Sequence, residues 1–82
     1  MNGQVRIHFK PKQDGYVTIK IYDFAMNLVT TVLDNKYEEG DQEHDTSWDG
    51  KNDKGDFVVN GVYFFKLEAK GQTEWGKVVV IK

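Results

Sequence analysis

The sequence predicts an all-β domain, an antiparallel sandwich of about seven short strands. Apolar and polar residues alternate over short runs, which is the pattern of a strand with one buried face. Glycine, asparagine and aspartate interrupt these runs at intervals of about 8 to 12 residues, as they do between the strands of a sandwich. No stretch repeats apolar residues at the helical period, so helices are not expected.

The first three strands are expected at residues 5–10, 16–22 and 28–33. In the first, Val5, Ile7 and Phe9 alternate with basic residues. Pro11 ends that strand because proline cannot donate a hydrogen bond to a central ladder. The Asp14-Gly15 pair then supplies the turn, since glycine accepts a positive φ.

Four further strands are expected at residues 42–48, 57–59, 62–69 and 75–81. The polar, acidic stretch 35–41 is predicted to be a loop. Trp48 is the one strongly apolar residue of its strand, which indicates an edge strand with a single anchor. Residues 70–73 are predicted to form the last turn and to place Tyr63 opposite Val78 or Val80.

The length predicts one domain, residues 1–82, because so short a chain supports a single compact core. The sequence contains no cysteine, so no disulfide or cysteine-bound zinc stabilises the fold. Buried apolar side chains must therefore stabilise it alone. The expected core is Val5, Ile7, Val17, Ile19, Ile21, Trp48, Tyr63, Phe65, Leu67, Val78 and Val80.

Charge is distributed unevenly. Residues 34–56 carry nine acids and three lysines, a formal charge of −6, whereas the remainder carries +4. An acidic segment repels phosphate and the basic residues are scattered, which argues against nucleic acid as a partner. The longest apolar runs, Val62–Phe65 and Val78–Ile81, are four residues long. A membrane-spanning helix needs about 20, so no span is predicted.

The start of the chain, Met1 to Gln4, has neither the basic nor the apolar region of a signal peptide. We therefore expect the chain to be a segment of a longer precursor.

His44, Asp45 and Ser47 suggest a Ser-His-Asp triad, but their spacing argues against one. Residues three apart on a strand point to opposite faces, so His44 cannot take a proton from Ser47. His8 is the other histidine, and nothing in the sequence indicates a cleft that pairs it with His44. No catalytic residue is predicted.

Asp49, Asn52, Asp53 and Asp56 offer oxygen ligands of the kind that calcium accepts. Their spacing departs from the pattern D-x-[DN]-x-[DN]-G, because Lys51 takes the third position and the glycine comes late. Short aspartate and asparagine side chains also cap backbone amides in turns, with glycine at positive φ. Turn formation is the stronger prediction, and no metal or other cofactor is predicted.

Aromatic residues raise the alternative of a sugar-binding surface. Trp48 follows the inward alternation and is assigned to the core, whereas Trp75 and Tyr37 are better candidates for exposure. The full set of candidates is Trp48, Trp75, Tyr22, Tyr37 and Phe64.

The last two strands predict an exposed apolar surface. If Tyr63 and Val78 point inward, then the neighbouring residues on each strand point outward. An exposed apolar patch on a small protein usually marks a partner surface, here for the preceding domain or a second copy. The alternative is that a covering loop or the N-terminal segment buries the patch. We call this predicted surface the docking face, and its residues are Val62, Phe64, Trp75, Val79 and Ile81.

Several motifs run through nearly the whole chain: F-K-P-K-Q-D-G-Y-V-T-I-K-I-Y-D (9–23), L-V (28–29), W-D-G (48–50), D-K-G (53–55), G-V-Y-F-F-K-L (61–67) and K-V-V-V (77–80). Together they resemble the Ig-like domain of the flagellar hook-capping protein family, a module also appended to the C-termini of many secreted bacterial proteins. The resemblance implies an Ig-like or fibronectin III-like β-sandwich. Its structural motif comprises Trp48, Asp49, Gly50, Gly55, Gly61 and Tyr63.

The resemblance also implies a non-catalytic, extracytoplasmic accessory module at the C-terminus of a secreted or cell-surface protein. Gly61-Val62-Tyr63 and Lys77–Val80 are similar to the C-terminal sorting domains of type IX secretion as well. The expected partner is the preceding domain of the parent protein or another protein surface. The alternative is a carbohydrate-binding module of a secreted glycan-active enzyme, with a glycan as the ligand.

One position departs from the family. After Tyr22-Asp23 the family usually has glycine where this chain has Met26. A bulky residue rarely takes a positive φ, so Asn27 is expected to take it instead.

Overall fold

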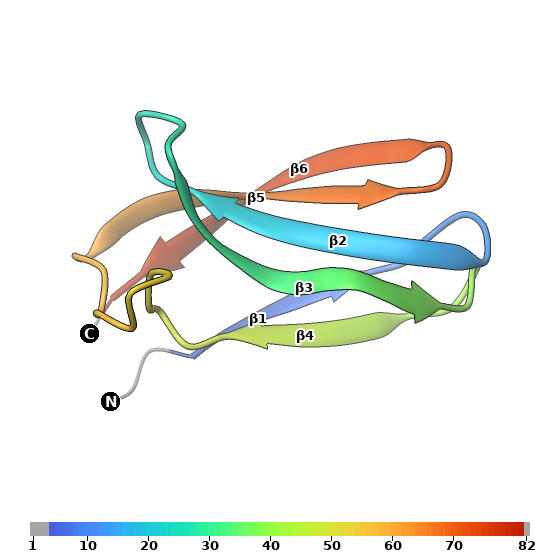
Figure 1. The fold of residues 1–82 in the computed structure, drawn as a ribbon, viewed down its shortest axis with the longest axis horizontal. Coiled ribbons are helices and arrows are strands. Elements are labelled where there is room, and N and C mark those ends of the chain that lie inside the picture. The colour runs from blue at the N-terminus through green and yellow to red at the C-terminus, as the bar shows by residue number, and fades with distance from the viewer. Residues whose placement is uncertain (1–3, 82) are drawn as a thin grey trace.

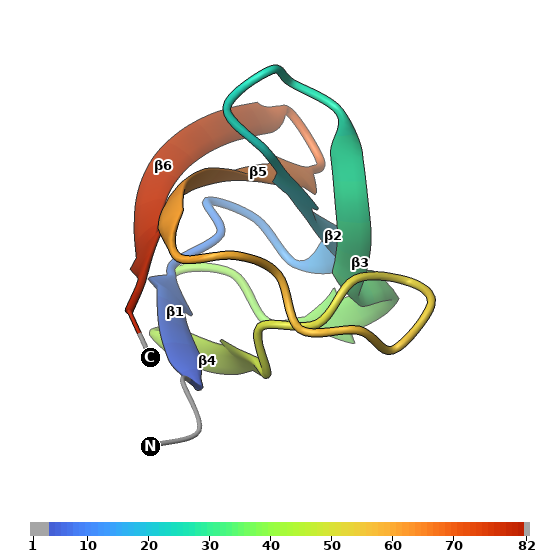
Figure 2. The ribbon, with the colours of Figure 1, turned by 90° about the vertical axis from the view of Figure 1, so that its left-hand side faces the viewer.

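A computed structural model describes residues 4–81; residues 1–3, on which most of the signal-peptide prediction falls, and residue 82 lie outside the described part. The described part contains six strands: β1 (Val5–Phe9), β2 (Gly15–Tyr22), β3 (Leu28–Glu38), β4 (His44–Trp48), β5 (Gly61–Ala69) and β6 (Gln72–Val80). All pairs are antiparallel. β1 and β4 form one sheet, and the other has the order β3-β2-β5-β6. The two sheets face each other as an Ig-like sandwich (Figure 1, Figure 2).

The predicted strand at 57–59 is wrong, which is why six strands are found rather than seven. Phe57 forms an isolated bridge with Lys51 instead of a strand, and the N–H of Val58 donates to the carbonyl of Gly50 at 2.8 Å. The segment therefore folds back on the loop that precedes it instead of joining a sheet.

The predicted loop at 35–41 is also largely a strand, because β3 continues to Glu38. The first residues of β2 pair with this extension of β3: Gly15 pairs with Glu38, and Tyr16 pairs with Tyr37. The register shifts along this pair, and Asn35 has a φ of 53°. β3 lies at a sheet edge, where polar residues face water and need no apolar alternation.

Several other strand ends also differ from the prediction. β1 ends at Phe9 and β4 begins at His44, β2 and β5 each begin one residue earlier, at Gly15 and Gly61, and β6 spans Gln72–Val80 rather than residues 75–81. Ala69 pairs with Gln72, so Lys70 and Gly71 alone form the last turn. Tyr63 pairs with Val78, the first of the two predicted registers.

Trp48 anchors the core. Its side chain is 1% exposed and its ring meets that of Tyr63 edge to face, with centroids 5.5 Å apart. Most predicted core residues are buried; Val5 and Phe65 are only partly buried, and Phe9 is an addition. The buried apolar residues are Ile7, Phe9, Val17, Ile19, Ile21, Trp48, Tyr63, Leu67, Val78 and Val80.

One end of the sandwich, which we call the turn end, consists of the turns 10–14, 39–43 and 70–71 (Figure 1). Hydrogen bonds join these turns. The N–H of Asp41 donates to the carbonyl of Pro11 at 2.6 Å, and the N–H of Gly40 donates to Asp14 Oδ1 at 2.7 Å. Lys12 N–H donates to Gln72 Oε1 at 2.9 Å. The three turns are therefore tied into one unit.

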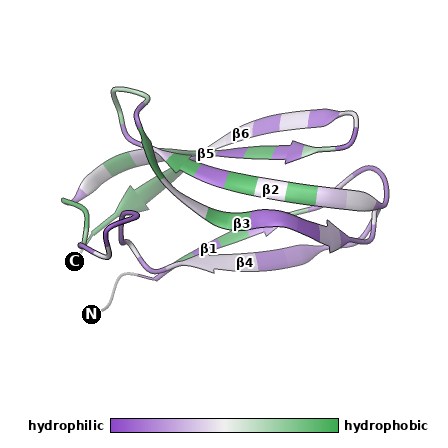
Figure 3. Ribbon diagram, in the orientation of Figure 1, coloured by the Kyte–Doolittle hydropathy of each residue, from purple (hydrophilic) through white to green (hydrophobic). Residues whose placement is uncertain are grey.

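The opposite end, which we call the loop end, consists of the turn 23–27 and the connection 49–60 (Figure 1, Figure 2). β1 begins and β6 ends at this same end (Figure 1). Colouring by hydropathy separates the two ends: the connection before β5 includes a hydrophobic stretch, whereas the turns of the turn end are mostly hydrophilic (Figure 3).

Met26 itself takes the positive φ, at 67°, so the prediction for Asn27 is wrong. The N–H of Met26 donates to the carbonyl of Asp23 at 2.9 Å, and the N–H of Asp23 donates to the carbonyl of Asn27 at 3.0 Å. The Asp23 side chain meanwhile accepts the N–H of Asn27. With these bonds in place, Asn27 lies outside the left-handed region, and Met26 is the residue that adopts the left-handed conformation. A left-handed residue other than glycine costs roughly 1 to 2 kcal/mol.

Candidate functional site

The loop after Trp48 is held by its own side chains. Asp49 Oδ1 accepts the N–H of Lys51 at 3.0 Å. Asn52 Oδ1 accepts the N–H groups of Lys54 at 2.9 Å and Asp56 at 3.0 Å. Gly50 and Gly55 have φ values of 80° and 85°, which favour glycine. The turn chemistry predicted for this loop is therefore present.

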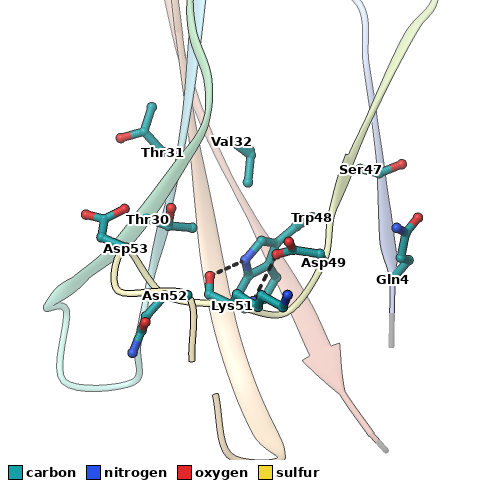
Figure 4. Close-up of a pocket in the computed structure, with 11 residues that line it drawn as sticks. Gln4, Thr30, Thr31, Val32, Ser47, Trp48, Asp49, Lys51, Asn52 and Asp53 are labelled. Carbon is teal, nitrogen blue, oxygen red and sulfur yellow. Dashed lines mark hydrogen bonds between the residues drawn. The ribbon is translucent and has the colours of Figure 1, made fainter. Parts of the chain in front are cut away.

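A hollow of about 510 Å³ lies between this loop, β3 and β4 (Figure 4). Its wall includes Thr30, Ser47 and Asp49, and the indole of Trp48 donates from Nε1 to the carbonyl of Lys51 at 2.9 Å. That bond satisfies the polar atom of the indole. Because the ring is also buried, Trp48 supports the wall of the hollow and has no exposed ring face for a ligand.

The acidic residues of the loop do not form a metal cluster. Within residues 4–81, no three His, Cys, Asp or Glu side chains lie close enough to hold a metal ion. The two side chains best placed to bind calcium, Asp49 and Asn52, instead accept backbone N–H groups. The Asp49 carboxylate and the Asn52 amide oxygen therefore serve the turn.

The histidines do not meet a nucleophile. His44 and Ser47 alternate in burial along β4 and lie on opposite faces. His44 Nδ1 lies 3.3 Å from Glu38 Oε1, and its ring stacks on Phe9 with centroids 5.5 Å apart. His8 contacts Asp45 across the β1–β4 pair. Each histidine therefore has a structural partner.

The residues of the docking face lie on the outer side of β5 and β6. Val62 pairs with Val79, and Val62 is partly buried while Val79 is 51% exposed. Phe64 is partly buried, whereas Trp75 is 49% and Ile81 69% exposed. The structure thus leaves apolar surface along this hairpin.

The candidate sugar-stacking residues are already engaged. The ring of Trp75 lies 5.4 Å from that of Tyr22, and Lys66 Nζ lies 5.5 Å from the Trp75 centroid. Tyr37 meets Tyr16 edge to face at 5.6 Å. Trp75 is on β6 and Tyr37 on β3, at opposite edges of the larger sheet, so they do not form one platform.

A family model described as the FlgD Ig-like domain matches residues 1–73. The chain belongs to the FlgD Ig-like domain family. No curated protein matches it. Among solved structures, it is similar to dimeric latent PorU from Porphyromonas gingivalis, with 19% sequence identity and a TM-score of 0.75. The match covers all of this chain and 8% of the PorU chain, so the same fold occurs as a small part of a much longer protein.

This FlgD Ig-like domain has further exposed apolar residues that the sequence argument missed. Phe24 is 77% and Val59 78% exposed, and both lie at the loop end. The ring of Phe24 lies 6.2 Å from that of Phe64, which joins the loop end to the docking face. The sequence contains a pattern that could have indicated these residues. Apolar residues occur inside two segments bounded by turn-forming residues, at Phe24 to Met26 and at Phe57 to Val59.

The described residues form no helix suited to crossing a membrane.

Two ionisable groups of this FlgD Ig-like domain are perturbed at the loop end. The backbone N–H of Asn27, assisted by its side chain and by Ala25 N–H, holds the pKa of the Asp23 carboxyl below its usual value. Burial, and next the charge of Asp23, raise the pKa of the Tyr63 hydroxyl. That hydroxyl donates to the carbonyl of Val59 at 2.7 Å. Tyr63 thereby connects the core to the loop end.

Proposed function

We propose that this domain is a non-catalytic accessory module of a longer secreted or cell-surface protein. Its role is to contact the preceding domain of the parent chain through the docking face. The single observation that carries the proposal is the set of apolar side chains left exposed on β6, where Val79 is 51% and Trp75 49% exposed. Exposed apolar patches on small domains usually mark partner surfaces.

Two further observations support a neighbouring domain as the occupant. β1 begins and β6 ends at the same end of the sandwich (Figure 1), which is also the end where Val62 and Val79 pair near the start of β5. A tethered neighbour there has a high effective concentration and needs only a modest interface. The similar fold in PorU also makes up only 8% of that chain. Hook capping and type IX sorting are two settings in which such a contact would serve.

The glycan alternative has less support. Stacking on sugar requires an aromatic face that is free, yet the ring of Trp75 is contacted by Tyr22 and by the Lys66 ammonium group. We therefore favour a protein partner.

The test uses the module and the preceding domain of its parent as separate chains, with calorimetry to measure binding. The module carries its own buried core around Trp48, so it is suited to separate expression. Phe64→Ser should weaken binding at least about tenfold, as for a central interface residue. Tyr16→Ser is the matched control, because Tyr16 is an exposed aromatic residue outside the docking face, and it should leave the affinity unchanged.

Three outcomes would contradict the proposal. The first is no binding between the wild-type chains. The second is a large loss of stability for Phe64→Ser with unchanged affinity, which would place Phe64 in the core. The third is a dimer of the module in sedimentation that Phe64→Ser disrupts, which would make a second copy the occupant.

A further inference from the structure

A second hollow, of about 300 Å³, lies at the loop end between the turn after β2 and the segment that leads into β5. Its lining includes Asp23, Phe24, Val59, Val62 and Tyr63. Val62 also belongs to the docking face, so the hollow and that face are continuous. Its volume suits one large side chain of a partner better than a whole small ligand.

The walls of the hollow are apolar and exposed. Phe24 and Val59 have the largest exposed fractions among the large apolar residues of the described chain. Both come from segments that are already fixed by hydrogen bonds. The Asp23 side chain holds the turn that carries Phe24, and the Tyr63 hydroxyl holds the carbonyl of Val59. A preformed pocket loses little entropy when it binds.

Asp23 supplies the one charge among the residues that line this hollow. Its Oδ1 accepts two backbone N–H groups, while Oδ2 accepts only the Asn27 side-chain amide, at 3.3 Å. A carboxylate has about four lone-pair positions, so Oδ2 retains capacity for a cationic donor.

We propose that the hollow binds an arginine side chain presented by the partner, with the aliphatic stem against Val59 and Val62 and the guanidinium beside Phe24 and Asp23. Arginine fits because its stem packs on apolar surface while its head keeps its charge. The guanidinium also stacks on aromatic rings and is more weakly hydrated than an ammonium group. The inference rests on the contact function proposed above and names the chemistry of the partner.

The experiment titrates N-acetyl-arginine amide into the ¹⁵N-labelled module and follows the amide resonances of Phe24, Gly61 and Val62. A ligand of this size should bind with a dissociation constant on the order of 1 mM. N-acetyl-citrulline amide has nearly the same shape without the charge, and N-acetyl-leucine amide offers only an apolar side chain. Both should bind at least about fivefold more weakly, because neither carries the positive charge that pairs with Asp23 and lies on the Phe24 ring.

Two variants test whether Asp23 causes the preference for arginine over citrulline. Asp23→Asn retains the capping oxygen and removes the charge, so it should reduce the preference for arginine over citrulline to what the Phe24 ring alone provides. Asp56→Asn is the matched control, since Asp56 is an acidic residue of the connection 49–60 at the same end and does not line the hollow, and it should keep the preference. Should Asp23→Asn alter the fold, Val59→Ser removes part of the wall and should weaken arginine binding instead.

Equal binding of arginine and citrulline amides, or tighter binding of the leucine amide, would overturn the proposal. So would shifts confined to residues away from the hollow. Because this titration uses the isolated module, it separates the pocket chemistry from the docking of the preceding domain, which the Phe64→Ser experiment tests.

Discussion

The two ends of the sandwich are built differently. At the turn end, Gly40 and Asp41 donate to Asp14 and Pro11, so that neighbouring turns hold one another. At the loop end, the fixing bonds lie mostly within each segment, around Asp23 and Asn52. One bond ties the connection 49–60 to β3, from Asp53 N–H to the carbonyl of Val29.

Under the proposed function, this difference means that the exposed apolar residues of the loop end make the contact with the partner. The exposed large apolar residues of the irregular segments, Phe24, Met26, Phe57 and Val59, all lie at the loop end. Short polar side chains hold these segments in shape without covering the apolar ones. A surface that is rigid and apolar binds a partner at low entropic cost.

The largest expected effect comes from Trp48, the buried residue from which the loop end starts. Trp48→Ala should cost about 3 to 5 kcal/mol, because it removes a buried ring and leaves a cavity. Denaturant unfolding measures the change. A loss below about 1 kcal/mol would mean that Trp48 does not anchor this end.

At the turn end, Gly40→Ala should cost about 1 to 3 kcal/mol. A Cβ at position 40 would meet the backbone of Gln13 and Asp14, and the backbone cannot yield as a side chain does. Gly55→Ala is an informative comparison, because a Cβ at Gly55 meets nothing and only its φ of 85° opposes the change. If Gly40→Ala has no effect in the same assay, the turns are not packed together as described.

At the loop end, Met26→Gly should raise the free energy of unfolding by about 1 kcal/mol, since glycine takes a positive φ without strain. Asn27→Gly is the control and should not stabilise, because Asn27 is not among the residues with positive φ. The opposite ranking in thermal unfolding would show that Asn27 carries the left-handed conformation.

The smallest expected effect is that of calcium on the loop 49–56. Asp49 and Asn52 already accept backbone N–H groups, so the loop is formed without a metal. Adding millimolar calcium to chelator-treated protein should leave the melting temperature unchanged. A rise of several degrees would show that calcium binds the native state.

The sequence predicted the parts of this fold that follow from alternation and turn chemistry. The inward positions of β2 and the burial of Trp48 follow from period two, and the caps at Asp49 and Asn52 follow from residue type. The residues 34–38 of β3 were missed because an edge strand needs no apolar pattern. Phe57 was wrongly placed in a strand because propensity cannot reveal that its segment folds back on Lys51.

The candidate site was likewise predictable from the sequence only in part. The outward positions of β5 and β6 follow from strand geometry, so the docking face could be named in advance. The hollow beside Asp23 depends on two segments far apart in the chain, and the turn that supplies one of them has Met26 in the left-handed conformation. No local pattern indicates that Phe24 and Val59 flank one hollow.

The central claim is that the apolar residues of the loop end serve contact rather than folding. The most direct measurement is urea unfolding of the double variant Phe24→Ser/Val59→Ser. Because both side chains are more than three-quarters exposed, the free energy of unfolding should fall by less than about 1 kcal/mol. A loss above about 2 kcal/mol would place these side chains in the folded core and contradict the account.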